Sequence, residues 1–587
     1  KNHKMSEATL MMRMDRGRRA KQDEGWFIQE GPIENHYKVW PLMAIICFPC
    51  IGALLVGFDM GGCAWMMIAI RLCSHEYNSW CDTVENNVYL AATLESMSPI
   101  AATLTCICIY IFGGSKLGGR TELILSAMFY TIGSTMEAES AEITSGSAGL
   151  IVCFVGRFIY GIGAGFSLHA IPNFVAENSP PNLRGTLGGF IEIFMTIGQI
   201  YSYAIGQWLT YEFPYDYPWK YTFKFGTLFG IIMFFGMLAL PESPRWLVGA
   251  GRPLYEALEA AHFVNPDVTS EMIVLLKKDI ERQAPRPING VMISPAERLM
   301  SPALRVPMMV GLALVIAQQV TGLPGMLYYC IEIFKEVAPT DLMIALATFS
   351  VSKIVGAVAV MLLMDSSGRR PLLIGGMLLM FLSSGSLFLL FFDSLQKESQ
   401  YKWAFVILLD LFVIGYEFSV GSVTFVLLGE IFPGDVKGDA VSIAFIVNFF
   451  LSAAMIFFLY WEITDIGYSV VWGQFSIMCF VFLFFAASMV PETKGKTLEQ
   501  IQKEFQEEFD VPDFLDAVEY FDPSSGADDT DVGETNPLVG DAAAESSQNN
   551  NATQPGGRRR TKRSGGSNNA TTTTTPLSVD NEDTPLV

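Results

Sequence analysis

The sequence predicts an all-α membrane protein with twelve transmembrane helices in two halves of six. Only 17% of the 587 residues are charged and 51% are hydrophobic, whereas a soluble chain of this length would divide into several domains with charged surfaces. Apolar runs recur between Trp40 and Val490, and each has roughly the 20 residues that a helix needs to cross a bilayer. A polar stretch, residues 241–303, separates the first six runs from the last six.

The apolar runs define the expected helices in order along the chain. The first run is far longer than the apolar region of a cleaved signal peptide, so we expect it to remain as the first span. The polar stretch after the sixth run has a Glu/Leu/Lys pattern typical of short amphipathic helices that lie on the membrane face. The expected spans are 39–70, 87–112, 122–138, 147–175, 185–209, 223–240, 304–334, 341–364, 371–392, 403–428, 440–461 and 468–490.

The basic residues predict the orientation of these spans. Lys and Arg gather in the N-terminal segment and in alternate loops, at Arg13, Arg16, Arg18, Arg19, Lys116, Arg120, Arg184, Arg245, Arg252, Lys277, Lys278, Arg369, Arg370 and Lys437. The intervening loops are poorer in them, and several are acidic, as at Glu137, Glu139, Glu142, Glu462 and Asp465. Because basic loops stay in the cytoplasm, both termini are expected there.

Spans and orientation together divide the chain into six regions. These are a cytoplasmic N-terminal segment (1–38), a six-helix half (39–240), a cytoplasmic linker with short helices (241–303), a second six-helix half (304–490), a cytoplasmic motif after the last span (491–520) and a cytoplasmic tail (521–587).

Two stretches outside the spans have their own expectations. The tail is rich in Asp, Ser, Asn and Thr, cannot bury a core and is expected to be disordered. Cys73 and Cys81 both fall in the first polar loop. An extracellular location of that loop would allow them to form a disulfide, and two free thiols are the alternative.

A weak internal repeat supports the division into two halves. "GGSKLGGR" after the second span corresponds to "DSSGRR" after the eighth, "ENSPPNLRG" after the fourth to "GEIFPGDVKG" after the tenth, and "PESPR" after the sixth to "PETKG" after the twelfth. Two parallel repeats of six helices, with a substrate site near the midplane between them, are typical of major-facilitator transporters.

Six motifs in register resemble the sugar-porter family of the major facilitator superfamily. They are "GRFIYGIGAG" at Gly156, "ENSPPNLRG" at Glu177, "PESPRWL" at Pro241, "QQVTG" at Gln318, "GRRPLL" at Gly368 and "PETKGKTLEQI" at Pro491. Together they cover nearly all of residues 39–505. The resemblance implies the major facilitator fold and alternating access around a hexose-like substrate.

The resemblance also implies a cytoplasmic gate, in which charges at helix ends pair when that side is closed and separate when it opens. The alternative is that these charges only mark topology. Gly119 and Ser366 stand where the family often has Arg, which predicts a weaker gate. The expected gate residues are Arg120, Glu177, Arg184, Glu242, Arg245, Arg369, Arg370, Glu430, Lys437 and Glu492.

One carboxylate, Asp59, lies inside the first apolar run ("GFDM"), where an unpaired charge costs roughly 2.5–3.5 kcal/mol. Asp59 is 19 residues from Trp40 on an outward helix, and Arg157 is 20 residues from Glu177 on an inward one. At ~1.5 Å per residue the two share a depth of ~30 Å from the cytoplasm, so we expect them to pair.

In sugar porters this pair distinguishes two mechanisms. Proton-coupled members have Asp in this motif of the first helix, facing the Arg of "GRF", whereas facilitative mammalian glucose carriers tend to have Asn. If the Asp59–Arg157 contact changes between conformations, the proton affinity of Asp59 changes with it, and a proton gradient can drive the solute. The alternative is a static, structural ion pair.

The resemblance places the substrate ligands near the bilayer midplane. Gln318, Gln319 and Asn448 match sugar-binding amides, which suit hydroxyl groups because an amide offers both donors and an acceptor. Phe425 and Phe449 match aromatic positions that line the cavity, and Tyr328 and Tyr329 follow on the seventh helix. Each amide taken alone would equally well bond one helix to another.

Three positions depart from the family at this site. Glu192 stands where the family has a sugar-binding Gln, Lys353 where it commonly has Asn, and Pro324 where an Asn contacts substrate. Glu192 and Lys353 lie ~12 Å and ~18 Å from the cytoplasmic ends of their helices, so they could pair across the cavity. They would then neutralise each other and leave a sugar site, or bind a charged substrate, or Glu192 would be a second proton site. Glu95 and Glu417 are further intramembrane carboxylates.

The leading hypothesis is secondary active transport of a monosaccharide or related polyol, with protons as the coupling ion. The alternatives are a facilitative carrier, a carrier of a charged solute and a non-transporting nutrient sensor. No nucleophile–base set, phosphate loop or metal-ligand spacing appears outside the spans, so no enzyme activity, cofactor, metal or nucleic-acid partner is expected. The plasma membrane is the first expectation for location, with a vacuolar or other endomembrane as the alternative.

Overall fold

The computed structural model describes residues 38–71, 80, 83–84, 87–112, 117–143, 146–179, 184–212, 218–283, 299, 301–337, 341–392, 401–432, 436–496, 500–501 and 503–505. Within these ranges every regular element is a helix. Cys73, Cys81 and the tail from residue 521 lie outside the described residues.

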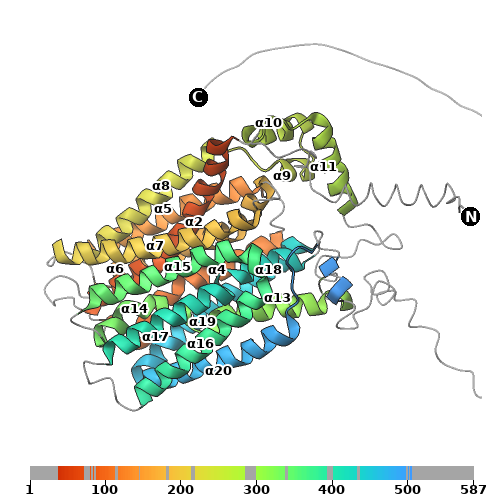
Figure 1. Cartoon of the computed structure of the whole chain (residues 1–587). Helices are drawn as coiled ribbons and strands as arrows, with labels where there is room; N and C mark the ends of the chain where they lie inside the picture. The colour runs from red at the N-terminus through yellow and green to blue at the C-terminus, as the bar shows by residue number, and fades with distance from the viewer. Residues whose placement is uncertain are drawn as a thin grey trace, which may run out of the picture. The chain divides into compact units, whose positions relative to one another are not determined.

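The first half of the chain forms six long helices (Figure 1). They are α2 (Val39–Arg71), α4 (Val88–Phe112), α5 (Gly119–Ser140), α6 (Gly146–Asn178), α7 (Arg184–Glu212) and α8 (Pro218–Ala239). Three short helices follow, and Figure 1 shows them grouped together: α9 (Pro244–Gly249), α10 (Leu254–Val264) and α11 (Ser270–Gln283). They share a small apolar core around Leu247, Ala257 and Ile273.

The second half contains the remaining six spans, of which two are interrupted and a third ends in a π-helical turn. The elements are α13 (Pro302–Val320) with α14 (Leu323–Val337), α15 (Leu342–Ser367), α16 (Arg369–Phe392), α17 (Lys402–Tyr416) with η4 (Glu417–Gly421) and α18 (Val423–Ile431), α19 (Lys437–Trp461) with η5 (Glu462–Ile466), and α20 (Tyr468–Met489). Among the described helices, ten spans are long and apolar enough to cross a membrane. The more polar α5 and α7 have matching lengths and complete the predicted twelve.

The two interruptions have physical causes in the backbone. The seventh span breaks at Gly322, whose φ of 92° is readily adopted only by glycine. The tenth span contains the π-helical segment η4, in which Ser419 has non-helical angles (φ −113°, ψ −108°). Irregular backbone inside a membrane protein is tolerated where it is buried in protein, and both breaks lie beside the candidate substrate residues described below.

The short helices mark one end of the bundle, which we call the linker end. The backbone N–H of Lys38, just before α2, donates to the carbonyl of Val264 at the end of α10 (3.0 Å). Ser243, the N-cap of α9, is a hydrogen-bond partner of Glu177 near the end of α6. The opposite end of the bundle is called the far end.

The two halves contact each other along several helix pairs, including α4 with α19, α7 with α15 and α2 with α14. At the far end the Tyr203 hydroxyl of α7 donates to the carbonyl of Leu327 in α14 (2.7 Å). There the rings of Tyr89 and Phe457 also stack, with centroids 6.5 Å apart. These contacts join the halves on the side away from the linker.

Close crossing of α2 and α7 positions the segment that carries Asp59. A Cβ added to Gly57 would lie 1.8 Å from the carbonyl oxygen of Met195, and one added to Gly198 would lie 1.9 Å from that of Leu54. The two glycines therefore allow backbone-to-backbone contact. Small residues are enriched at such interfaces because lipid supplies no hydrophobic force to bring helices together.

We expect Gly198→Ala to destabilise the folded protein by roughly 1–3 kcal/mol, because the added methyl group would collide with the backbone of α2. Gly188→Ala on the same helix is the matched control, since a Cβ there meets nothing within 4 Å. Melting temperatures of the two variants in the same detergent measure the difference. Equal melting temperatures would show that the crossing is not tight.

Candidate functional site

A charge pair lies in the middle of the N-terminal half. The Arg157 guanidinium on α6 donates through Nη1 to the Asp59 carboxylate on α2, and Nη2 donates to the backbone carbonyl of Glu95 on α4 (3.3 Å). Arg157 is fully buried and Asp59 is only 3% exposed. The contact expected from their equal depth is therefore present, and it joins three helices around one guanidinium.

A second carboxylate, Glu137, adjoins the same guanidinium; it lies at the end of the expected span 122–138 but is grouped with Glu139 and Glu142 in an expected acidic loop. That expectation is wrong, because α5 continues to Ser140 and Glu137 is fully buried, with Oε1 3.8 Å from Nη1 of Arg157. Its neighbours Glu139 and Glu142 do face outward and pair with Lys224 and Lys220 (3.5 and 3.0 Å).

The sequence contained a signal for the burial of Glu137. One face of α5 carries polar residues at helical spacing, all of them buried: Glu122, Ser126, Tyr130, Ser134 and Glu137. A stripe with steps of four and three residues is a single helix face. Because α5 packs against α6 and α8, this stripe faces protein and not lipid.

A second charged cluster connects the two halves. The Lys353 ammonium on α15 donates to Glu192 on α7 (3.0 Å), to Glu417 in η4 (2.7 Å) and to the Thr196 hydroxyl (3.2 Å). Every one of these side chains is less than 10% exposed. The expected pairing of Glu192 with Lys353 across the halves is therefore present, and Glu417 is a second partner that the depth argument did not identify.

The amide residues also lie together. Asn448 on α19 donates to the Oε1 of Gln318 on α13 (2.7 Å), and Nε2 of Gln318 approaches the carbonyls of Val420 and Gly421 in η4 (3.2 and 3.4 Å). The break in the tenth span thus supplies the acceptors for Gln318. The Oε1 of Gln319 is buried and has no hydrogen-bond partner among the described residues.

The helices that carry these amides, and the segments next to them in the chain, also carry aromatic side chains that contact one another. Phe425 is half-buried and stacks on Phe445 (centroids 6.0 Å apart, planes at 19°). Tyr329 packs beside Tyr460 and donates to the carbonyl of Ile456 (2.9 Å). Of the predicted ligands, Gln318 and Asn448 are in direct contact, and Phe425 stacks on Phe445, three residues before Asn448 on α19.

At the linker end, the two halves repeat one arrangement of charges. In the first half, Oε1 of Glu242 accepts from the backbone N–H of Arg120 (3.1 Å) at the start of α5, and the Arg120 guanidinium donates to the carbonyls of Met237 and Leu238 at the end of α8. A carboxylate at a helix N-terminus and a cation at a C-terminus are both favourable to the helix dipole.

The second half uses equivalent residues in the same way. Glu492 accepts from the backbone N–H groups of Arg369 and Arg370 (3.0 and 3.1 Å) at the start of α16, and Arg370 donates to the carbonyl of Ala487 near the end of α20 (2.6 Å). The repeated "PE" motifs therefore have a shared structural function. Gly118 and Gly368 precede the two helices, and a Cβ on either would meet the carboxylate within 2.6 Å.

Most of the expected gate charges thus bond within their own half. Arg369 pairs with Glu430 (2.9 Å), which also accepts from Thr493 (2.6 Å), and Lys437 donates to the carbonyl of Gly429 (2.8 Å). Glu177 of the first half has Lys437 of the second half and Arg245 of the linker as oppositely charged neighbours. Arg184 begins α7, and its side chain lies outside the described residues.

Burial raises the pKa of the Glu242 carboxyl above its ordinary value, and the N–H donors of Arg120 and Ser243 partly offset that effect. The hydrogen bonds at the start of α5 thus favour the charged carboxylate that caps this helix.

A buried histidine was not identified from the sequence. His169 on α6 bonds through Nδ1 to Glu122 on α5 (2.9 Å) and through Nε2 to the Ser442 hydroxyl on α19 (3.2 Å). Ser442 belongs to the other half, so this is a polar contact between halves on the linker side of the bundle. A single histidine in an apolar run carries no positional signal that would have revealed it.

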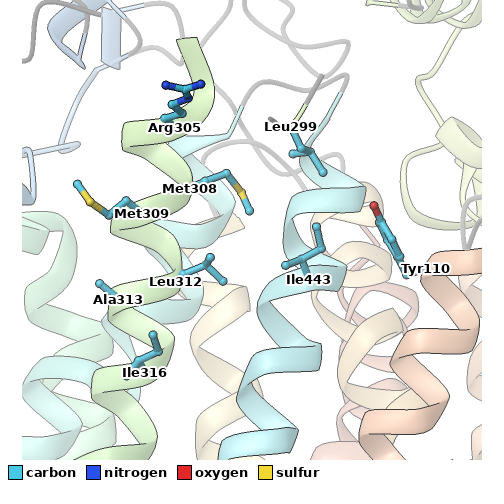
Figure 2. A pocket seen from close by; sticks show the side chains of 9 residues that line it. All are labelled: Tyr110, Leu299, Arg305, Met308, Met309, Leu312, Ala313, Ile316 and Ile443. Atoms are coloured by element: carbon cyan, nitrogen blue, oxygen red, sulfur yellow. The ribbon is translucent and has the colours of Figure 1, made fainter. Parts of the chain in front are cut away.

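A cavity of about 540 Å³ lies elsewhere, between α4, α13 and α19 (Figure 2). Its lining is apolar apart from Arg305 and Tyr110, with Met308, Leu312 and Ile443 among its walls. Figure 2 shows Tyr110 on one helix opposite the α13 side chains. The cavity thus lies where the halves meet, and none of the predicted substrate residues lines it.

Comparison with known proteins identifies the family. Residues 45–505 match the family described as "Sugar (and other) transporter". The chain belongs to this sugar transporter family. The resemblance to sugar porters inferred from the six motifs is therefore confirmed, and the protein is a multi-pass membrane protein of a transporter family.

Two curated relatives show how far the similarity extends. The chain is 28% identical over 498 residues to "D-xylose-proton symporter-like 2" of Arabidopsis thaliana, covering 81% of this chain and 93% of the relative. It is 25% identical over 493 residues to the "Arabinose-proton symporter" of Bacillus subtilis, covering 80% and 97%. The similarity therefore includes both six-helix halves.

Among solved structures, the chain is similar to the proton:xylose symporter XylE of E. coli, a member of the major facilitator superfamily. The TM-score is 0.67 at 21% identity, covering 80% of this chain and 99% of that one. At this level of identity the likeness shows the fold, which confirms the predicted twelve-helix major facilitator architecture.

We expect Lys353→Gln to lower the stability of the folded protein by roughly 3–5 kcal/mol, because two buried carboxylates would lose their cation. Glu192→Gln should cost much less, since Lys353 then keeps a one-to-one pair with Glu417. The double variant should recover part of the loss, because one buried charge fewer remains uncompensated. Melting temperatures test the cycle, and strictly additive losses would contradict it.

Proposed function

We propose that the protein is a secondary active transporter that carries a monosaccharide or related polyol together with protons, by alternating access. The observation that carries the proposal is the buried Asp59–Arg157 pair in the centre of a major-facilitator half. The relatives named as xylose-proton and arabinose-proton symporters support the same assignment.

Asp59 is the proposed proton carrier. A carboxylate that is paired with a guanidinium favours its charged form, and one that is separated from it in a buried site favours its protonated form. A conformational change that alters the Asp59–Arg157 contact would therefore alter the proton affinity of Asp59. Proton binding and release on opposite sides of the membrane would then be coupled to the movement of the solute.

The proposed sugar ligands are Gln318, Gln319, Asn448 and Phe425. The unsatisfied Oε1 of Gln319 supports this assignment, because a buried amide oxygen without a donor favours binding of a hydroxyl group. The Gln318–Asn448 bond would be exchanged for bonds to the sugar. Phe425 supplies an apolar surface for a face of the pyranose ring.

The charged cluster supports a neutral substrate over a charged one. An ammonium has three N–H donors, and the three donors of Lys353 match its three contacts with Glu192, Glu417 and Thr196. No donor is left for a carboxylate on the substrate. We therefore assign Glu192 and Lys353 to the wall of the substrate site, where Lys353 serves both Glu192 and Glu417 and connects the two halves.

Alternating access would separate the contacts between halves in turn. On the linker side these are the charged neighbours Glu177 and Lys437 and the His169–Ser442 bond, and on the far side the Tyr203–Leu327 bond. The helix-end contacts of Arg120, Glu242, Arg369, Arg370, Glu430 and Glu492 would keep each half rigid as it rotates. The basic loops favour cytoplasmic termini, and we propose the plasma membrane as the location.

Uptake of a panel of labelled monosaccharides into proteoliposomes tests this proposal. With an inward proton gradient, the wild-type protein should accumulate the sugar above its external concentration, while Asp59→Asn should only approach equilibrium because position 59 no longer binds a proton. If both proteins merely equilibrate the sugar, Asp59 is structural and the protein is a facilitative carrier. Binding without any uptake would indicate a sensor.

A further inference from the structure

We propose that Glu137 is the second counterion of Arg157. When Asp59 takes up its proton, the Arg157 guanidinium moves from Asp59 to Glu137. This inference rests on the proposed proton-coupled function and names a positioning residue for it. Asp59 would bind the proton, and Glu137 would make that binding possible without leaving a buried cation unpaired.

The geometry places Arg157 between two carboxylates. The same nitrogen, Nη1, contacts Asp59 directly and lies 3.8 Å from Oε1 of Glu137. A charge-assisted bond to a guanidinium is about 2.7–2.9 Å long, so a displacement of about 1 Å would transfer Nη1 from one carboxylate to the other. All three residues belong to the same half, so rigid-body rotation of the halves is not needed for the exchange.

Glu137 is free to accept the guanidinium. Both of its carboxylate oxygens are buried and have no hydrogen-bond partner among the described residues. The site is built for close approach, because a Cβ on Gly156 would lie 3.0 Å from Cγ of Glu137 and 2.9 Å from its backbone nitrogen. The glycine that precedes Arg157 therefore makes the room in which Glu137 reaches it.

Among the described residues, Arg157 has two carboxylate neighbours, Asp59 and Glu137. The other titratable groups that face this cluster are uncharged or acidic: Cys63 on α2, Glu95 on α4, Tyr130 on α5, Cys153 and Tyr160 on α6, and Tyr328 on α14. Arg157 donates to the backbone carbonyl of Glu95 (3.3 Å). Among these residues, Glu137 is the carboxylate poised to replace Asp59.

The physical need for a second counterion follows from the chemistry of arginine. A guanidinium stays protonated at every physiological pH, and a buried charge that loses its partner is strongly unfavourable. Protonation of Asp59 removes the negative charge from the present pair. With Glu137 at hand the site then contains a neutral Asp59 and a new Arg157–Glu137 pair.

The first test is the pH profile of gradient-driven uptake by Glu137→Gln, with Glu139→Gln as control. Without Glu137 the protonated form of Asp59 is less favourable, so half-maximal uptake should move to a more acidic pH by about one unit, a tenfold change in proton affinity. Glu139 lies on the same helix but pairs with the exposed Lys224, so its variant should follow the wild-type profile. An unshifted profile for Glu137→Gln would overturn the inference.

The second test is a double-variant cycle on sugar exchange without a gradient, which does not depend on coupling. Asp59→Asn still leaves Arg157 paired with Glu137, whereas adding Glu137→Gln leaves it with neither. The double variant should lose at least about tenfold more exchange than the product of the single losses, since the residues share one partner. Multiplicative losses would refute the exchange of partners.

A third variant distinguishes a loss of exchange caused by unfolding from a loss caused by the missing ion pair. If the double variant melts early, adding Arg157→Gln removes the unpaired cation and should restore the melting temperature; a failure to do so would also refute the inference. If instead the wild-type protein shows no proton-driven uptake, the proposed function fails, while the exchange cycle still reports whether Glu137 pairs with Arg157.

Discussion

The N-terminal half depends on one constraint, the need to keep the Arg157 guanidinium compensated in the centre of a membrane. Its three kinds of contact, with the Asp59 carboxylate, the Glu95 backbone carbonyl and the nearby Glu137, draw α2, α4 and α5 around α6. The glycines follow from this arrangement. Gly156 and Gly133 let α5 approach α6, and Gly57 and Gly198 let α2 approach α7, at distances that a methyl group would prevent.

The two halves are stabilised in the same way at the linker end. Glu242 and Glu492 each cap the helix that begins the third span of their half, and Arg120 and Arg370 each bind carbonyls near the end of the sixth. These contacts join the start of the third span to the end of the sixth span within each half. Charges that bond within one half do not have to separate when the two halves rotate against each other. Alternating access therefore has to break only the smaller set of contacts between halves.

Between the halves, the buried charged groups that the structure describes are few and lie in contact with one another. Lys353 joins Glu192 of one half to Glu417 of the other, and His169 joins Glu122 to Ser442. Buried ion pairs contribute little net stability, yet they penalise every arrangement that separates them without compensation. Such contacts favour a small number of defined conformations, a property suited to a site that must be closed on one side when it is open on the other.

The sequence by itself determined the number of spans, the division into halves and the depth of single charges. Depth is readable because a helix advances ~1.5 Å per residue, so Asp59 and Arg157, or Glu192 and Lys353, could be matched by counting. The repeated motifs likewise predict that Glu242 and Glu492 are equivalent, and both do cap a helix in the same way. Family motifs selected Gln318 and Asn448, which the fold does bring together.

Only the tertiary structure decided which side of each helix meets which neighbour. Glu137 stood at the edge of an apolar run and was assigned to a loop with Glu139, because a run's end does not reveal its rotation. Glu417 reaches Lys353, and Gln318 reaches η4, through a π-helical break that has no sequence signature of its own. The positions along the helices were local properties of the chain. Their partners depended on helix rotation and close crossing, which arise when all the spans pack together.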